Sequence, residues 1–285
     1  MICIPFLGFI SAVILLWGRG IDLVALLVCS VMYLFTALGL TMGYHRLFTH
    51  RSFVAKRWLK ISLAIVGAMA AEGPLFFWCA MHRKHHQHSD TPLDPHSPHH
   101  HGSDISGILR GFLHAHVGWM LKAPAVNYRK YVPDLLRDKD LVWVSRNYFL
   151  WLCLGIILPG FIALSIHHTT ISFIQGVLWG GFARIFLLHH ATWSINSLCH
   201  MSGDRPFKTT DQSRNNKLCA IWSLGEGWHN NHHAFPASAR HGLMKWQIDL
   251  TYLGIKLLYS LGFANDLKVP SDKDIHSKAS EPHIG

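Results

Sequence analysis

The sequence predicts an all-α membrane protein, with four transmembrane helices in two hairpins and a helical polar cap on the cytoplasmic side. Three observations predict it: half of the 285 residues are hydrophobic, only 15% are charged, and the apolar residues gather in long runs separated by basic segments. A soluble domain is about 25% charged. The composition is therefore too apolar for most soluble enzymes, and it excludes a disordered chain, a collagen-like chain and a disulfide scaffold.

The first predicted hairpin joins residues 2–17 to residues 21–43. Residues 2–17 are apolar throughout, but at about 1.5 Å per residue this run is short for a hydrocarbon core of about 30 Å. We expect a first span rather than a cleaved signal peptide, because no basic segment precedes the run. Residues 21–43 are long enough to cross.

The second predicted hairpin joins residues 147–166 to residues 171–190, and its link lacks Lys and Arg. Of the 26 Lys and Arg residues, 13 lie in 44–145 and 10 in 191–285. This asymmetry predicts that segments 44–146 and 191–263 and both termini face the cytoplasm. We therefore attribute the net charge of +10 to a surface that faces anionic lipid, and we do not expect a nucleic-acid partner.

Three shorter features complete the predicted organisation. Residues 58–80 are apolar but interrupted by Glu72-Gly73-Pro74, so we expect an interfacial or re-entrant helix, since a fifth crossing would reverse the charge asymmetry. Residues 244–262 mix apolar and charged residues, as an interfacial helix does. Residues 1–263 then form one domain, and we expect 264–285 to be a polar, mobile tail.

The 23 histidines, which outnumber the 16 acidic residues, are the strongest functional signal. Three clusters follow apolar stretches with the spacings HxxxxH, HxxHH and HxxHH, and they contain His45, His50, His82, His85, His86, His229, His232 and His233. Positions i, i+3 and i+4 share a helix face, so each HxxHH presents three imidazoles together. Positions i and i+5 do not, so one histidine of the first pair lies beyond the helix end or the helix is distorted there.

Eight histidines are too many for one ion and would suit a dinuclear iron centre. Imidazole binds zinc, copper and nickel as well as iron, so the histidines alone do not identify the metal. A neutral imidazole ligand needs an acceptor for its other N–H group, and candidates are Asp90, Asp94, Glu226 and the pair Asn230-Asn231. The run at 99–101 is expected to be a solvated loop. We do not expect His189 and His190 to be ligands.

The segments HRLFTHRSF (45–53), HRKHHQHSD (82–90) and GEGWHNNHHAFP (225–236) resemble the histidine boxes of the membrane fatty-acyl desaturases, in the acyl-CoA Δ9 (stearoyl-CoA) group. So do Asp94-Pro95-His96, His116-Val117-Gly118-Trp119 and the NSxxH element at 196–200. The resemblance covers about residues 20–250. The residues before His82 lack the charges that help to hold coenzyme A in animal enzymes, which puts the acyl carrier in question.

The resemblance implies two iron ions, O₂ as co-substrate, a long-chain acyl-CoA or another acyl carrier, and a cap on four spans. It adds His200 to the eight clustered histidines as an iron ligand, and Asn196 as a residue that reaches one iron through water. The electron donor would be a separate protein of ferredoxin, rubredoxin or cytochrome b5 type. The membrane would be the inner membrane of a bacterium or the endoplasmic reticulum of a eukaryote.

Tunnel walls are expected from the second span and from 58–80. Cys29, Tyr33 and Ala37 share a helix face that leads toward His45, and we predict that Tyr33 closes the tunnel, with simple helix packing as the alternative. The resemblance adds Trp78 and Trp193 as acyl contacts.

Two other classes of function stay open at this point. One is a related enzyme, either an acyl-phospholipid desaturase or a fatty-acid or alkane hydroxylase. The other is a metal transporter, which would place its ligands near the middle of the bilayer. The histidine clusters lie beyond the predicted spans, which argues against transport.

Overall fold

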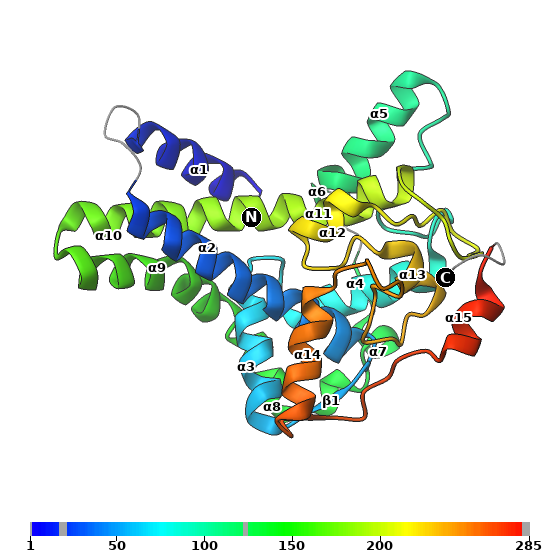
Figure 1. Ribbon diagram of the computed structural model, residues 1–285. Helices are drawn as coiled ribbons and strands as arrows, with labels where there is room; N and C mark the ends of the chain where they lie inside the picture. The colour runs from blue at the N-terminus through cyan, green and yellow to red at the C-terminus, as the bar shows by residue number, and fades with distance from the viewer. Residues whose placement is uncertain (1, 17–21, 122–124, 281–285) are drawn as a thin grey trace.

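The computed structural model describes residues 2–16, 22–121 and 125–280. In these residues the chain is mostly helical. An elongated group of apolar helices meets a broader part made of shorter helices and loops, termed the cap (Figure 1). The expected link at 18–20 lies outside the described residues. The apolar helices are α1 (Cys3–Leu16), α2 (Leu23–Leu38), η1 (Gly39–Thr49), α9 (Tyr148–His167), α10 (Thr170–Gly176), η4 (Val177–Ala183) and α11 (Arg184–Met201).

Three continuous helical stretches are long and apolar enough to cross a membrane. They are Leu23–Thr49, Tyr148–His167 and Thr170–Met201. Two of them extend beyond the predicted spans. The π-helix η1 continues α2 to Thr49, and η4 joins α10 to α11, which continues to Met201. Helix α1 is apolar but has only 14 residues, about 21 Å. It packs against α11, where Phe9 stacks on Phe186 at a ring-centroid distance of 4.6 Å.

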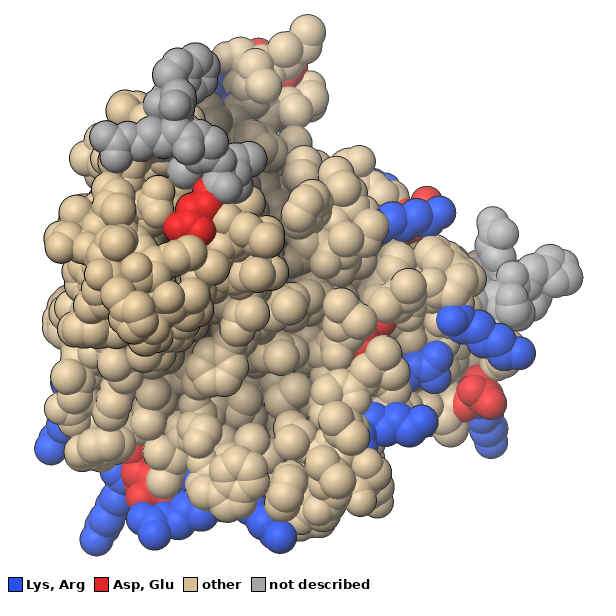
Figure 2. Space-filling model, turned by 60° about the vertical axis from the view of Figure 1, so that its left-hand side comes forward, with Lys and Arg blue, Asp and Glu red and all other residues tan. Residues whose placement is uncertain are grey.

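The surface of this helical group is apolar. Figure 2 shows a broad face without Lys or Arg, whereas the basic side chains lie along its lower and right-hand edges. Exposed side chains include Leu27, Val31, Phe149, Phe161 and Ile174. A contiguous apolar surface of this extent is unfavourable in water. Together with the three long helices, it supports a membrane protein.

The stretch expected as one helix at 58–80 forms two helices, α3 (Arg57–Ala68) and α4 (Leu75–His88). The interruption at Glu72-Gly73-Pro74 separates them, since Pro74 lacks the N–H group that would continue a helix. Helix α3 is about 18 Å long, too short to cross a bilayer. Helix α4 carries the second histidine cluster.

A buried arginine fixes the segment between α3 and α4. Arg184 is fully buried and donates to the carbonyl oxygens of Met69 and Gly155, each at 2.8 Å, and of Gly180 at 3.1 Å. An arginine among apolar helices is stable only when its donors are satisfied. These bonds join α9, η4, α11 and the segment that starts at Met69.

The remaining elements build the cap. They are α5 (Ile105–Leu113), η2 (His114–Gly118), α6 (Trp119–Leu121), α7 (Tyr128–Tyr131), η3 (Leu135–Arg137), α8 (Lys139–Arg146), α12 (Lys217–Trp222), α13 (His229–Ala234), α14 (Leu250–Ser260) and α15 (Asp272–Lys278). The expected helix at 244–262 is α14, which is shorter and exposes Leu253 and Leu257 while burying Ile255.

The expectation of a mobile tail is wrong for residues 264–280. Strand β2 (Ala264–Asn265) pairs antiparallel with β1 (Val54–Ala55), and the Nζ atom of Lys278 donates to the carbonyl oxygen of Ala234 at 2.6 Å. Ile275 is buried against the cap. Sparse apolar residues anchor this polar segment, and composition alone did not reveal that. Residues 281–285 lie outside the described residues.

Candidate metal centre

The first histidine pair sits on a π-helix. In η1 the turn is wider than in an α-helix, and the backbone N–H group of His50 donates to the carbonyl oxygen of His45 at 3.1 Å, which is the i→i+5 pattern. The two rings consequently lie 4.8 Å apart between centroids. His50 caps the helix, so both expectations for this spacing are confirmed: the helix is distorted, and one histidine lies at its end.

The nine histidines form two groups. Within each group the candidate ligand atoms lie within 4.8 Å of one another. The first group contains His45, His50, His82, His86 and His232, and the second contains His85, His200, His229 and His233. Each HxxHH cluster is therefore divided. Its first and last histidines, at i and i+4, join one group, and its middle histidine turns to the other.

The inward ring nitrogens fit metal ions. The Nε2 atom of His232 lies 3.2 Å from that of His45 and 2.9 Å from that of His86, and the Nε2 atoms of His200 and His229 are 3.1 Å apart. The Nε2 atoms of three further histidines are buried without a hydrogen-bond partner in the described residues: His50, His85 and His233. Convergent lone pairs on neutral imidazoles are a donor set for a transition metal.

Carboxylates hold the outer Nδ1 atoms of four of these rings. Asp94 lies 3.0 Å from His85, Asp90 lies 2.9 Å from His200, Asp211 lies 2.7 Å from His233, and Glu226 contacts His45. A proton held on Nδ1 leaves the Nε2 lone pair free for a metal. Asp90, Asp94 and Glu226 thus take the expected role. Asp211 was missed, because it lies in a loop 22 residues before His233, the histidine that it contacts.

The pair Asn230-Asn231 does not take that role. Asn230 accepts from the backbone N–H group of Phe207 at 2.8 Å. Asn231 donates to the carbonyl oxygen of His241 at 2.8 Å and to Gln247 at 2.7 Å. Both amides tie the cluster-bearing helix α13 to surrounding loops.

Burial and charge keep these groups in the protonation states that metal binding needs. Burial, aided by repulsion between neighbouring imidazoles, holds pKa values well below 6.5 for His82, His86, His229 and His232. Burial alone would raise the pKa of Asp94, but the adjacent His85 more than reverses this and holds it well below its usual range. These four imidazoles are neutral at pH 7, and the Asp94 carboxylate is ionised.

Two further buried histidines extend the centre. His96 groups with His85 and Asp94, and His241 groups with His45 and Glu226. The sequence offered His96 only through the Asp94-Pro95-His96 element, and it offered no signal for His241. The histidines at 189 and 190 fall outside both groups, as expected. His189 hydrogen-bonds carbonyl oxygens of Ala70 and Ala71, and His99, in the predicted loop, contacts the carbonyl oxygen of His200 at 3.0 Å.

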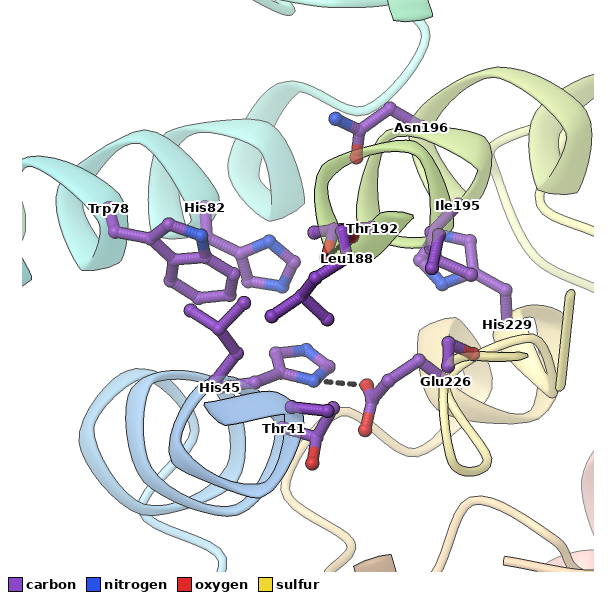
Figure 3. Close-up of a pocket in the computed structure, with 14 residues that line it drawn as sticks. Thr41, His45, Trp78, His82, Leu188, Thr192, Ile195, Asn196, Glu226 and His229 are labelled. Carbon is purple, nitrogen blue, oxygen red and sulfur yellow. Dashed lines mark hydrogen bonds and ion pairs between the residues drawn. The ribbon is translucent and has the colours of Figure 1, made fainter. Parts of the chain in front are cut away.

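Two cavities meet at the first histidine group. Figure 3 shows the smaller one, about 50 Å³, bounded by His45 on η1, Trp78 and His82 on α4, and Thr192 and Asn196 on α11. The larger one, about 670 Å³, shares the last four of these residues and also contacts Trp193. The two cavities thus adjoin beside the metal centre.

Three of the five predicted tunnel residues line one or both of these cavities, and two do not. Ala37 lines the smaller cavity, Trp78 lines both, and Trp193 lines the larger. Cys29 and Tyr33 are not among the residues that line either cavity. The Tyr33 hydroxyl instead donates to the carbonyl oxygen of Trp222 at 2.7 Å, next to Ser223 in the wall of the smaller cavity.

The fold and the centre define a helical membrane protein with two histidine groups able to hold metal ions. Residues 22–251 match the family model described as fatty acid desaturase, so the chain belongs to the fatty acid desaturase family. The family contains enzymes that oxidise fatty acyl chains, which agrees with an apolar cavity beside the histidines.

Curated relatives of this chain act on different acyl carriers. A hex-5-enoyl-[acyl-carrier protein] acetylenase of Moorena producens is 44% identical over 96% of this chain and 86% of that protein. An sn-1 stearoyl-lipid 9-desaturase of Synechocystis sp. is 38% identical over 87% of this chain and 73% of the relative. An acyl-CoA C20 Delta5-desaturase of Anemone leveillei is 37% identical over 88% and 75%, respectively.

Proposed function

We propose that this protein is an O₂-dependent acyl-CoA desaturase that introduces a cis Δ9 double bond into a saturated long-chain acyl group, with two iron ions and a separate electron donor. One observation carries the proposal: nine histidines, four of them held by carboxylates, form two groups beside adjoining apolar cavities. Family membership and the stearoyl-lipid 9-desaturase relative support it.

The first group would hold one iron with five imidazoles, and the second would hold the other with four. Asn196 on α11 lines both cavities and would reach one of the irons through water. Iron with O₂ supplies the oxidising power to remove hydrogen from unactivated methylene groups, which no amino-acid side chain can do. The chain contributes the geometry and the exclusion of water.

The residues around the centre have separable tasks in this proposal. Trp78 stacks on His82 with ring centroids 5.0 Å apart and forms a wall of both cavities. It would hold the acyl chain against the first histidine group. Mostly apolar walls exclude water from the reacting carbons, and the position of the chain decides which carbons react.

The proposal includes four spans, with α1 completing the first hairpin and with both termini and the metal centre in the cytoplasm. The basic segments on the cap side support this orientation. The shortness of α1 would be accommodated by local thinning of the bilayer.

A second candidate is an acetylenase that acts on a short acyl chain with a terminal double bond. The relative named hex-5-enoyl-[acyl-carrier protein] acetylenase favours it, since the similarity spans 96% of this chain. The small volume of one cavity agrees with a short chain tail beyond the metal centre.

The test is expression in a host that lacks unsaturated fatty acids, with iron and reductant supplied and products read by mass spectrometry. A desaturated product has lost two hydrogens, an acetylenic product forms from an alkene precursor, and a hydroxylated product has gained oxygen. Feeding acyl-CoA, acyl-carrier protein and acyl lipid separately to membranes identifies the carrier.

The His232→Ala variant should abolish the product, because His232 contacts both His45 and His86. His100→Ala, at an exposed histidine, is the matched control and should retain it. No double or triple bond from the wild-type protein with any carrier would refute the proposal.

A further inference from the structure

The larger cavity contains a carboxyl group that the proposed chemistry does not use. It lies where α1, α4, α6 and α11 meet, and its walls include Phe77, Met81 and Trp193. Glu72 is the one acidic residue among the described residues that line it. An ionisable side chain in an apolar cavity is a candidate functional group.

The backbone on both sides of Glu72 is held by hydrogen bonds from two other helices. Ala71 and Gly73 have positive φ angles of 64° and 103°. His189 on α11 hydrogen-bonds the carbonyl oxygen of Ala71 at 3.1 Å, and the Tyr148 hydroxyl on α9 accepts from the N–H group of Gly73 at 3.2 Å. A positive φ at a non-glycine residue costs about 1 kcal/mol or more. The fold therefore sustains a strained turn that places the carboxyl group at the cavity wall.

In the part of the chain that the structure describes, no Lys or Arg forms an ion pair with this carboxyl group. Its polar neighbours are Trp193 and Thr192, but its buried Oε1 atom has no hydrogen bond of good geometry in the described residues. The guanidinium of Arg184 is occupied by the carbonyl oxygens of Met69, Gly155 and Gly180. The other titratable groups on the elements around Glu72 are Cys3 on α1, Tyr148 on α9, His82 on α4, His189 on α11, and His96 in the loop before α5.

A further polar atom at the cavity, the indole Nε1 atom of Trp119, is buried without a partner among the described residues. A buried donor without a partner is costly, so its position at a cavity indicates a ligand with acceptor atoms. The cavity thus combines apolar walls with a few polar groups, which suits the carbonyl end of an acyl chain.

We propose that Glu72 admits the acyl chain only as a neutral carboxylic acid, and that its ionisation weakens acyl binding. This inference rests on the proposed function, because it identifies the larger cavity as the acyl site. The neutral acid can donate a hydrogen bond to an acyl carbonyl, whereas a carboxylate beside a bound chain would be stripped of water without a counter-charge.

Glu72 changes its protonation state within a pH range in which binding can be measured. Burial raises its pKa to about 8, so the group is mostly neutral at pH 7. A bound acyl chain removes more water and favours the neutral form further. Binding must then be accompanied by proton uptake, and affinity falls by up to about tenfold for each pH unit above the pKa of the free protein.

The experiment uses the full-length metal-loaded protein without reductant and a neutral probe, the stearoyl thioester of N-acetylcysteamine. Tryptophan fluorescence reports binding, since Trp78, Trp119 and Trp193 line the cavity. The wild-type affinity should be constant from pH 6.5 to 7.5 and fall about tenfold between pH 8.5 and 9.5. Glu72→Gln should bind with no pH dependence, and Glu72→Asp should restore the dependence.

Asp266→Asn is the matched control at an exposed acid and should behave as wild type. Proton uptake near pH 8, followed with an indicator dye, tests the wild-type protein alone if Glu72→Gln misfolds. A wild-type affinity unchanged at pH 9.5, a Glu72→Gln profile that still falls, or absence of proton uptake would overturn the inference. Failure of the proposed function gives a different result, which is no desaturated product at pH 7.

Discussion

Replacing Asp94 with asparagine should weaken metal binding selectively at the second histidine group. Both carboxylate oxygens of Asp94 lie 3.0 Å from Nδ1 of His85, and they also accept from the backbone N–H groups of Asp90 and His96. Asparagine retains the shape but loses the charge and one acceptor oxygen. The His85 ring would then be less basic and less firmly oriented.

The expected size of the effect follows from comparable acceptors of metal-binding histidines. Their loss costs about 10- to 100-fold in metal affinity, which corresponds to about 1.4–2.8 kcal/mol. His85 belongs to the second histidine group, whereas His82 and His86 on the same helix belong to the first. The loss should therefore fall on one ion.

The assay is metal content after dialysis against graded chelator concentrations. The wild-type protein should release its ions at high chelator, and Asp94→Asn should release one ion at a concentration about 10- to 100-fold lower. Asp266→Asn, at an exposed acid, should match the wild type. Release of both ions together, or an unchanged profile, would show that the cluster is not divided as the structure divides it.

Three further predictions follow from the cap and the cavities. Thermal stability of the metal-free protein should fall as pH drops below about 6.5, because the depressed pKa values of the buried histidines mean that the unfolded chain binds more protons; equal melting temperatures at pH 7.5 and 5.5 would contradict this. Arg46→Met should destabilise the protein by about 3–5 kcal/mol, since it leaves buried Glu226 and Asp249 without their cation. Arg57→Met, at an exposed pair with Asp140, should change the denaturation midpoint little. Tyr33→Ala should let the smaller cavity accept longer acyl chains by freeing the backbone at Trp222, and an unchanged product chain-length profile would count against a role in closing the tunnel.

Much of the membrane part could be predicted from sequence, because hydropathy is a local property. The runs at 21–43, 147–166 and 171–190 correspond to the three long helices, although two of these extend into the cap. Because the π-helix η1 continues α2, one helical stretch runs through the apolar region and also presents His45 and His50 together. The five-residue spacing of His45 and His50 predicted a distorted helix or a histidine beyond the helix end, but it did not predict a π-helix.

The apolar runs, the polar segments between them and the histidine clusters that could hold metals were all predictable from the amino-acid sequence. These features depend on composition and on residues close together in the chain. Tertiary structure alone decided which histidines face one another, because the partners are distant in sequence: His45 and His232 are 187 residues apart. The tertiary structure also decided which acidic residues contact the histidines. Asp211 reaches His233 across a loop, and Glu226 lies between His45 and the fully buried Arg46. Such contacts require the packing of separate elements, which no local spacing encodes.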